Sequence, residues 1–233
     1  MVTSRLPRSI RAWICAGTSN MAGAAIGGVV KPLVFVLLLA PFGYGVLQVA
    51  LIVAGQPHEL GADPAKALVL FTGEWSIRLI LAGLAVSTLA RVTGYTQVMR
   101  FRRMVGLFAF FYVTVHLSSY LGFLLGLRFD ELIADVIKRP YITVGFLAWL
   151  MLVPLAATSN RFMVRKLGRR WRILHRLVYP VSVLCVLHFL WQARADIGEP
   201  IVYGAVLAGL LGERGYRTLV SRRPISKVAA AAH

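Results

Sequence analysis

Residues 104–127 read MVGLFAFFYVTVHLSSYLGFLLGL, 24 consecutive residues without Asp, Glu, Lys or Arg. About 20 mostly apolar residues in a helix suffice to cross the hydrocarbon core of a bilayer. Arginines flank the stretch, with Arg102 and Arg103 before it and Arg128 after it. Because no water is present inside a bilayer, the backbone polar groups must bond within the segment, which requires a helix. The stretch therefore predicts a transmembrane helix.

Five further apolar blocks have the same character, at 32–53, 75–90, 141–157, 174–192 and 200–211. Charged residues make up only 15% of the 233-residue chain, below the roughly 25% of soluble domains. No segment between the blocks is long enough to form a separate flavin or nucleotide domain. We therefore predict an all-α fold, an integral membrane bundle of six transmembrane helices.

The charges between the blocks indicate the orientation of the helices. Residues 54–74 are net acidic, whereas the segments after the second and fourth blocks are strongly basic, with Arg91, Arg100, Arg102, Arg103, Arg161, Arg165, Lys166, Arg169, Arg170 and Arg172. Basic segments lie on the cytoplasmic side of membrane proteins, so both termini are predicted to be cytoplasmic. The same rule explains the net charge of +17, and we do not expect nucleic acid as a partner.

The chain divides into three parts on composition. Residues 1–30 are basic and then rich in small residues, and we interpret them as a flexible N-terminal extension. Residues 31–217 form the membrane domain, and residues 218–233 form a cytoplasmic tail. We find no internal repeat in the sequence.

Three histidines lie within or at the edge of predicted spans, and they are the strongest candidates for a functional site. They are His116 in the third span, and His175 and His188 in the fifth. An ionisable residue inside a membrane is costly and is a functional candidate by default. Neutral imidazole is a common metal and haem ligand. The alternative role is a hydrogen bond between helices.

The depth of these residues in the membrane favours His116 and His188 as a pair. His116 lies 13 residues after Arg103, and His188 lies 13 residues after His175, so each is about 20 Å deeper than the start of its span. Both spans start on the cytoplasmic side, which places the two side chains at one level. Two imidazoles facing each other suit the axial positions of a b-type haem. A zinc site would recruit a third or fourth ligand, and no acidic residue lies near that depth.

His175 and Arg102 lie together at the cytoplasmic ends of their spans. A guanidinium stays protonated and is not a haem ligand, but Arg102 could pair with a haem propionate or a flavin phosphate. Its alternative role is a surface charge that sets topology. His175 and His188 are about 220° apart on an ideal helix, so they share one face only if Pro180 kinks the span.

Several short motifs occur in an order that resembles the MsrQ (YedZ) family, within the wider group of ferric-reductase-like transmembrane domains. The resemblance covers roughly residues 31–217. The motifs are LGADP at 60–64, TG at 72–73, RRMVGL at 102–107, HLSSY at 116–120, RPYITVGF at 139–146, TSN at 158–160, LGRRWRILHRLVY at 167–179 and LHFLW at 187–191.

The resemblance implies a haem-binding subunit of a methionine-sulfoxide reductase system in the bacterial inner membrane. It implies b-type haem, one or two groups, with His116, His175 and His188 matching the family's histidines. Arg102 stands where the wider group has a fourth histidine. Electrons would come from a cytoplasmic flavin reductase or quinol, with FMN as an optional cofactor. They would pass to a periplasmic molybdopterin subunit that carries the substrate site.

We therefore expect a transmembrane electron carrier, with two rival functions. One rival is a ferric or quinone reductase that acts directly on a diffusible acceptor. The other is a non-redox transporter whose intramembrane histidines relay protons or bond between helices.

Overall fold

The computed structural model describes the backbone of residues 8–193 and 197–221, and the side chains of 28–193 and 197–220. Every regular element in these ranges is helical, and no strand occurs among them. The predicted all-α fold is therefore confirmed for the described part of the chain. The ends of the predicted extension and tail, residues 1–7 and 222–233, lie outside it.

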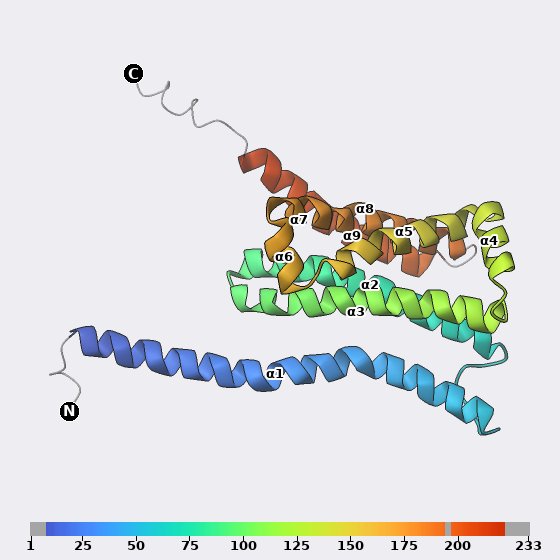
Figure 1. Ribbon diagram of the computed structural model, residues 1–233, viewed down its shortest axis with the longest axis horizontal. Helices are drawn as coiled ribbons and strands as arrows, with labels where there is room; N and C mark the ends of the chain where they lie inside the picture. The colour runs from blue at the N-terminus through green and yellow to red at the C-terminus, as the bar shows by residue number, and fades with distance from the viewer. Residues whose placement is uncertain (1–7, 194–196, 222–233) are drawn as a thin grey trace, which may run out of the picture. The chain divides into compact units, whose positions relative to one another are not determined.

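In the described residues, nine α-helices follow one another, with short turns between some of them (Figure 1). The turns are η2 (Thr96–Val98), the π-helical turn η3 (Tyr120–Leu124) and η4 (His175–Leu177). The α-helices in the described ranges are α1 (Arg8–Val53), α2 (Pro64–Thr93), α3 (Met99–Ser119), α4 (Phe129–Lys138), α5 (Pro140–Ala157), α6 (Arg161–Leu167), α7 (Arg169–Leu174), α8 (Val178–Gln192) and α9 (Gly198–Ser221).

Five helical stretches in the described residues are long and apolar enough to cross a membrane, which makes the chain a multi-pass membrane protein. They are Gly28–Val53, Pro64–Thr93, Thr96–Leu124, Pro140–Ala157 and Arg169–Gln192. α9 is 24 residues long but carries Glu199, Glu213, Arg214 and Arg217. These charges keep it below the apolar content of the other five, so a sixth span stays a prediction.

The chain separates into two compact units, Met1–Ala50 and Leu51–His233. The first consists of α1, which is helical from Arg8 and contains Pro32 and Pro41. Residues 8–30, which we interpreted as a flexible extension, thus continue into the first apolar block as one helix. The proposed domain boundary at residue 30 is not marked by a break in the backbone.

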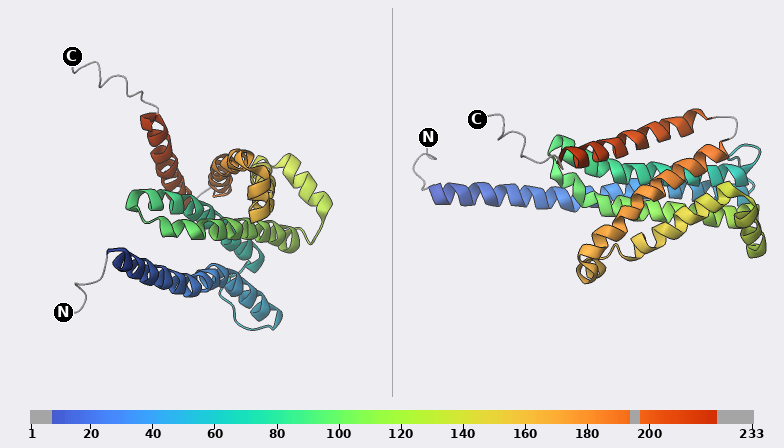
Figure 2. Two further views of the ribbon diagram at one scale, coloured as in Figure 1. Left: turned by 60° about the vertical axis from the view of Figure 1, so that its left-hand side comes forward. Right: turned by 90° about the horizontal axis from the view of Figure 1, so that it is seen from above.

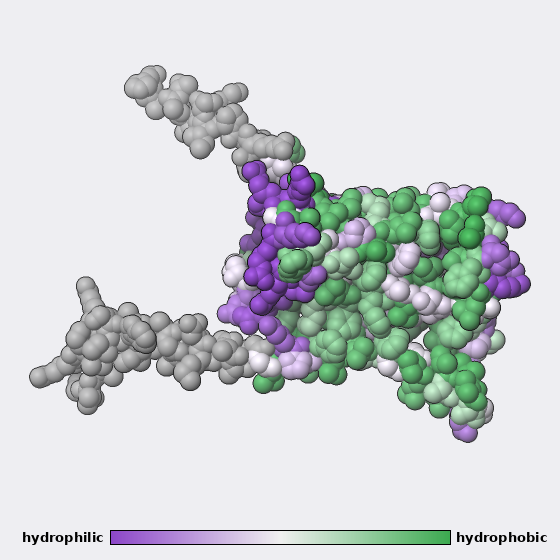
Figure 3. All heavy atoms as spheres, in the orientation of Figure 1, coloured by the Kyte–Doolittle hydropathy of each residue, from purple (hydrophilic) through white to green (hydrophobic). Residues whose placement is uncertain are grey.

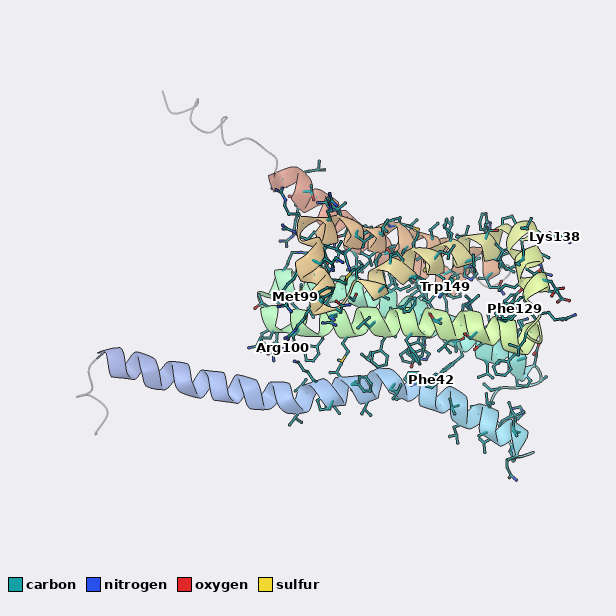
Figure 4. All side chains as sticks on the ribbon, viewed as in Figure 1. Phe42, Met99, Arg100, Phe129, Lys138 and Trp149 are labelled. Carbon is teal, nitrogen blue, oxygen red and sulfur yellow. The ribbon has the colours of Figure 1, made fainter. Side chains whose placement is uncertain are left out.

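Two helix pairs make up the centre of the second unit. The first pair is α2 with α3, the second is α5 with α8, and α9 packs on α2 and α8 (Figures 1 and 2). Ile77, Leu81, Leu84 and Leu207 form a buried cluster where α2 and α9 meet. Trp149 of α5 (Figure 4) donates from Nε1 to Thr114 Oγ1 of α3 over 3.2 Å, which joins the two pairs.

The second unit has two polar ends and an apolar surface between them. The basic end carries α6, α7 and the start of α3 at Met99 and Arg100, whereas α4, with Phe129 and Lys138, lies across the opposite end (Figures 1 and 4). We call the latter the α4 end. Hydrophilic residues gather at both ends in Figure 3, and the surface between them is mainly hydrophobic. This distribution fits a unit surrounded by lipid.

α2 begins eleven residues before the predicted second block. Asp63 caps it by accepting a hydrogen bond from the Lys66 backbone N–H over 3.0 Å, and Pro64 occupies the first turn, where its missing N–H costs nothing. The additional turns bring Val69 and Gly73 onto the helix beside α3. Both residues contribute to the site described next.

Candidate functional site

The rings of His116 and His188 lie side by side between the two helix pairs. Their centroids are 6.2 Å apart and their planes differ by 74°. His116 is in α3, three residues before its end, and His188 is in α8, four residues before its end. The structure thus brings together the two side chains that the depth argument paired.

Each of these rings is held by a backbone carbonyl of the neighbouring helix. His116 Nδ1 lies 2.9 Å from the Val69 oxygen in α2, and His188 Nδ1 lies 2.6 Å from the Tyr141 oxygen in α5. A carbonyl oxygen only accepts, so Nδ1 carries the proton in both rings and donates it. The lone pair of a neutral imidazole is then on Nε2. This is the arrangement that orients metal-binding histidines in proteins.

A glycine makes room for each ring. A Cβ at Gly73 would lie 3.0 Å from His116 Cε1, and a Cβ at Gly145 would lie 2.8 Å from His188 Nδ1. Contacts under 3.0 Å are essentially never made by real Cβ atoms. Gly145 therefore needs to be glycine for the ring to approach the helix backbone, and a Cβ at Gly73 would be tight against His116.

The two helix pairs present their histidines in the same way. Residues 69, 73 and 116 of the first pair recur as 141, 145 and 188 in the second, a shift of 72 in each case. We expected no internal repeat in the sequence, and within the site this spacing recurs once. Few other positions related by this shift of 72 carry the same residue type, so the recurrence is not apparent from the sequence. The recurring signal is a glycine 43 residues before each histidine.

A cavity of about 330 Å³ contains both rings. Its walls around them are largely apolar, with Ile77, Val113, Ala148 and Phe189, and its polar residues lie toward the α4 end. In the described residues, no group of three or more His, Cys, Asp and Glu side chains is placed to hold a metal ion. The site therefore offers two imidazoles to a ligand, which suits a group that brings its own equatorial ligands.

The spacing of the pair fits haem. With metal–nitrogen bonds of about 2 Å, as in zinc–imidazole bonds, two rings on opposite sides of one metal have centres about 6 Å apart. The observed 6.2 Å agrees with this. Each ring can turn about its own metal–nitrogen bond, so planes at 74° are compatible with two axial ligands.

His175 and Arg102 line a second cavity, of about 640 Å³, at the basic end. The same cavity is lined by Arg103, Arg161 and Trp171. The structure thus brings His175 and Arg102 together, as their predicted depth indicates, and separates both from the His116–His188 pair. Their role in binding a cofactor stays a prediction.

The environment of His175 differs from that of the other two rings. Its Nε2 lies 3.2 Å from Thr158 Oγ1, and its ring stacks on Trp171 at a centroid distance of 4.0 Å and 29°. Pro180 is the third residue of α8 and does not kink it, because the first turn of a helix needs no backbone N–H at that position. The turn η4 (His175–Leu177) lies between α7 and α8, so His175 is outside the regular α-helix that carries His188.

We expect His175→Ala to leave the ligand between His116 and His188 in place. His175 lines only the cavity at the basic end, and no contact joins it to the other two rings. The visible absorption of the detergent-purified variant, oxidised and reduced, measures this directly. Loss of the entire haem signal on removing His175 alone would contradict the separation of the two cavities.

Comparison with known proteins agrees with this geometry. The family described as ferric reductase like transmembrane component matches residues 72–186. The "Protein-methionine-sulfoxide reductase heme-binding subunit MsrQ" of Xanthomonas euvesicatoria pv. vesicatoria is 45% identical over 197 residues, 84% of this chain and 90% of that protein. The chain belongs to the MsrQ family. MsrQ proteins of the same description from Xanthomonas campestris pv. campestris strain 8004 and Polaromonas naphthalenivorans are 48% identical over 171 residues and 43% identical over 204 residues. They cover 73% and 86% of this chain, and 78% and 90% of their own lengths.

The family match includes most of the site. Residues 72–186 contain Gly73, His116, Gly145 and His175, and end two residues before His188. For this MsrQ-family chain, the matched region is thus the two helix pairs that form both cavities.

Proposed function

We propose that this chain carries electrons across the bacterial inner membrane through a b-type haem held by His116 and His188. The observation that supports this best is the ring pair itself, 6.2 Å apart with both Nδ1 atoms bonded to backbone carbonyls. The names of its relatives, which describe them as haem-binding, support the same cofactor.

When bound, the haem supplies one-electron redox chemistry, and the chain supplies ligation, orientation and a low-dielectric surrounding. His116 and His188 would be the axial ligands. The Val69 and Tyr141 carbonyls fix the tautomer and the ring planes, and Gly73 and Gly145 allow the rings to sit against the helices. The apolar walls exclude water from the metal.

Electrons would enter at the basic end. The cavity of about 640 Å³ there has arginine side chains and an aromatic ring beside His175, which suits a flat, anionic redox group such as FMN or a second haem. Arg102 would pair with its acidic group. A cytoplasmic flavin reductase is the donor that this arrangement favours, since the basic loops belong on the cytoplasmic side.

Six spans with both termini in the cytoplasm fit this direction. The charges of α9 lie near its two ends, so residues 200–212 carry none. Glu213 is paired with Arg91 over 2.9 Å and with Arg217 over 2.5 Å, and Arg214 donates to the Leu84 oxygen over 2.7 Å. Paired and terminal charges are those a membrane helix tolerates. With α9 as the sixth span, the α4 end is periplasmic.

Electrons would leave at the α4 end, near which His116 and His188 lie. The acceptor we propose is a periplasmic molybdopterin-containing subunit that reduces methionine sulfoxide. The substrate site would lie on that partner, so this chain is the electron-transfer subunit of an oxidoreductase.

Electron transfer can be tested in vesicles that contain the purified protein and a trapped, membrane-impermeant electron acceptor. NADPH, FMN and a flavin reductase are added outside. We expect the trapped acceptor to be reduced with the wild type, and at the rate of protein-free vesicles with His116→Ala. A colourless wild-type protein, or equal rates with and without protein, would contradict the proposed function and favour a non-redox transporter.

A further inference from the structure

The cavity that contains His116 and His188 is amphipathic along its length. Around the rings its lining is largely apolar, and of its two carboxylates Asp63 caps α2 and Glu74 is paired with Arg78 over 2.9 Å. At the α4 end it is also lined by Lys66, Tyr120, Arg139 and Gln192. Two of these are cations that come from different helix pairs. Lys66 lies in the first turn of α2, and Arg139 immediately precedes α5.

The side chain of Arg139 is held in place by its neighbours. Its Nε lies 3.0 Å from Asp135 Oδ1 of α4, and its guanidinium interacts electrostatically with the Tyr141 side chain. Asp135 is held in turn by the Tyr120 hydroxyl, which donates to its other oxygen. α4 thus positions the guanidinium at the mouth of the cavity.

Tyr141 connects Arg139 to the ring pair. Its carbonyl oxygen accepts from His188 Nδ1, and its ring stacks on His188 at a centroid distance of 6.4 Å and 28°. One residue, Tyr141, therefore lies between Arg139 and His188. A guanidinium has five N–H donors, and the ion pair with Asp135 is made by Nε, which leaves the terminal N–H groups for a carboxylate.

We infer that Arg139 and Lys66 bind the two propionate carboxylates of the haem, one cation from each helix pair. This assignment rests on the proposed function. Haem b has two carboxylates on one edge and an apolar opposite edge, so an amphipathic cavity admits it in one orientation. Charge-assisted hydrogen bonds from arginine to a carboxylate are among the strongest in proteins. The carboxylate edge then points toward the α4 end, where electrons leave.

A comparison of native and esterified haem distinguishes a contact with the propionates from a general effect on the fold. Esterifying both propionates removes their charge but keeps the porphyrin and its iron. If Arg139 contacts a propionate, Arg139→Gln weakens binding of native haem and has little effect on binding of the dimethyl ester. If Arg139 only stabilises α4 through Asp135, both haems are affected equally.

The test uses full-length protein produced without haem and loaded in detergent with either haem b or its dimethyl ester. The rate of haem loss to excess apomyoglobin is measured for the wild type, Arg139→Gln, Lys66→Gln and Arg139→Lys. Lys138→Gln is the matched control. It removes one positive charge from the residue next to Arg139, and the Lys138 side chain does not line the cavity. Resonance Raman bands of propionate bending give a second readout.

We expect Arg139→Gln and Lys66→Gln each to speed the loss of native haem roughly tenfold, the scale of one charge-assisted hydrogen bond. Loss of the ester should be unchanged, and the propionate band should shift. Arg139→Lys should recover most of the retention, and Lys138→Gln should behave as the wild type. Unchanged loss of native haem, or equal acceleration for native and esterified haem, would overturn the inference. A wild type that takes up neither haem would instead refute the proposed function.

Discussion

His116→Ala and His188→Ala should each yield protein with less than about a tenth of the wild-type haem content, because each removes one of two axial ligands. The remaining imidazole cannot compensate for its partner. In the described residues no third His, Cys, Asp or Glu lies close enough to form a metal-binding group with the pair. Haem content per mole of purified protein, from the absorption of a pyridine extract, is the measurement.

The two variants should also resemble each other, since the two histidines have matching surroundings. Each ring bonds through Nδ1 to a carbonyl 47 residues earlier in the chain. Any haem that remains should be five-coordinate and should change to a high-spin spectrum in both variants. Wild-type haem content in either variant would show that the ring pair does not hold the iron. His175→Ala, with its ring in the other cavity, is the control for loss of a membrane histidine.

The membrane helices could be predicted to the extent that apolar blocks and helices have the same bounds. The block at 141–157 corresponds to α5 (Pro140–Ala157) within one residue, because Arg139 and Pro140 end the apolar run where the helix begins. The block at 75–90 misses the first eleven residues of α2 and the last three. Charged residues such as Lys66 and Glu74 favour a loop, while capping by Asp63 and Pro64 favours a helix. Capping governs the start of this helix.

The segment between the third and fourth blocks shows a further limit. Residues 128–139 lie between two of the predicted spans and carry three acidic and three basic side chains, and Phe129–Lys138 form α4. Three apolar residues four positions apart, Phe129, Ile133 and Ile137, lie on one face of it and are more than 60% exposed. This periodicity is visible in the sequence, but a ten-residue helix is too short to be recognised as a span.

The ring pair could be predicted from depth alone, but the groups that orient it could not. Every residue has a backbone carbonyl, so nothing in the letters at Val69 or Tyr141 marks them as hydrogen-bond acceptors. Gly73 and Gly145 are two of 21 glycines, and their need for glycine arises only when a ring from another helix approaches. Tertiary contacts of backbone atoms carry no residue-specific signal.

Gly145→Ala should reduce haem binding nearly as much as loss of a ligand, although it changes no metal-binding group. The new Cβ would lie 2.8 Å from His188 Nδ1, 2.9 Å from Cε1 and 3.2 Å from Cγ. The ring itself is therefore in the way, and it is held against α5 by a 2.6 Å hydrogen bond from the same Nδ1 to the Tyr141 oxygen. Overpacking of this kind costs about 1–3 kcal/mol in a well-packed interior. Moving the ring to relieve it breaks the hydrogen bond or misdirects Nε2.

The two glycines predict a graded result, which distinguishes ring displacement from general damage to the fold. At Gly73 the closest approach is 3.0 Å, to His116 Cε1, so Gly73→Ala should lower haem content less than Gly145→Ala. Gly209→Ala is the matched control, since a Cβ there meets no atom within 4 Å and alanine favours a helix over glycine by about 1 kcal/mol. Haem content and the thermal unfolding midpoint should be measured together. If Gly145→Ala kept the haem content of the wild type, or if Gly209→Ala lost as much haem as Gly145→Ala, the approach of the His188 ring to α5 would not control haem binding.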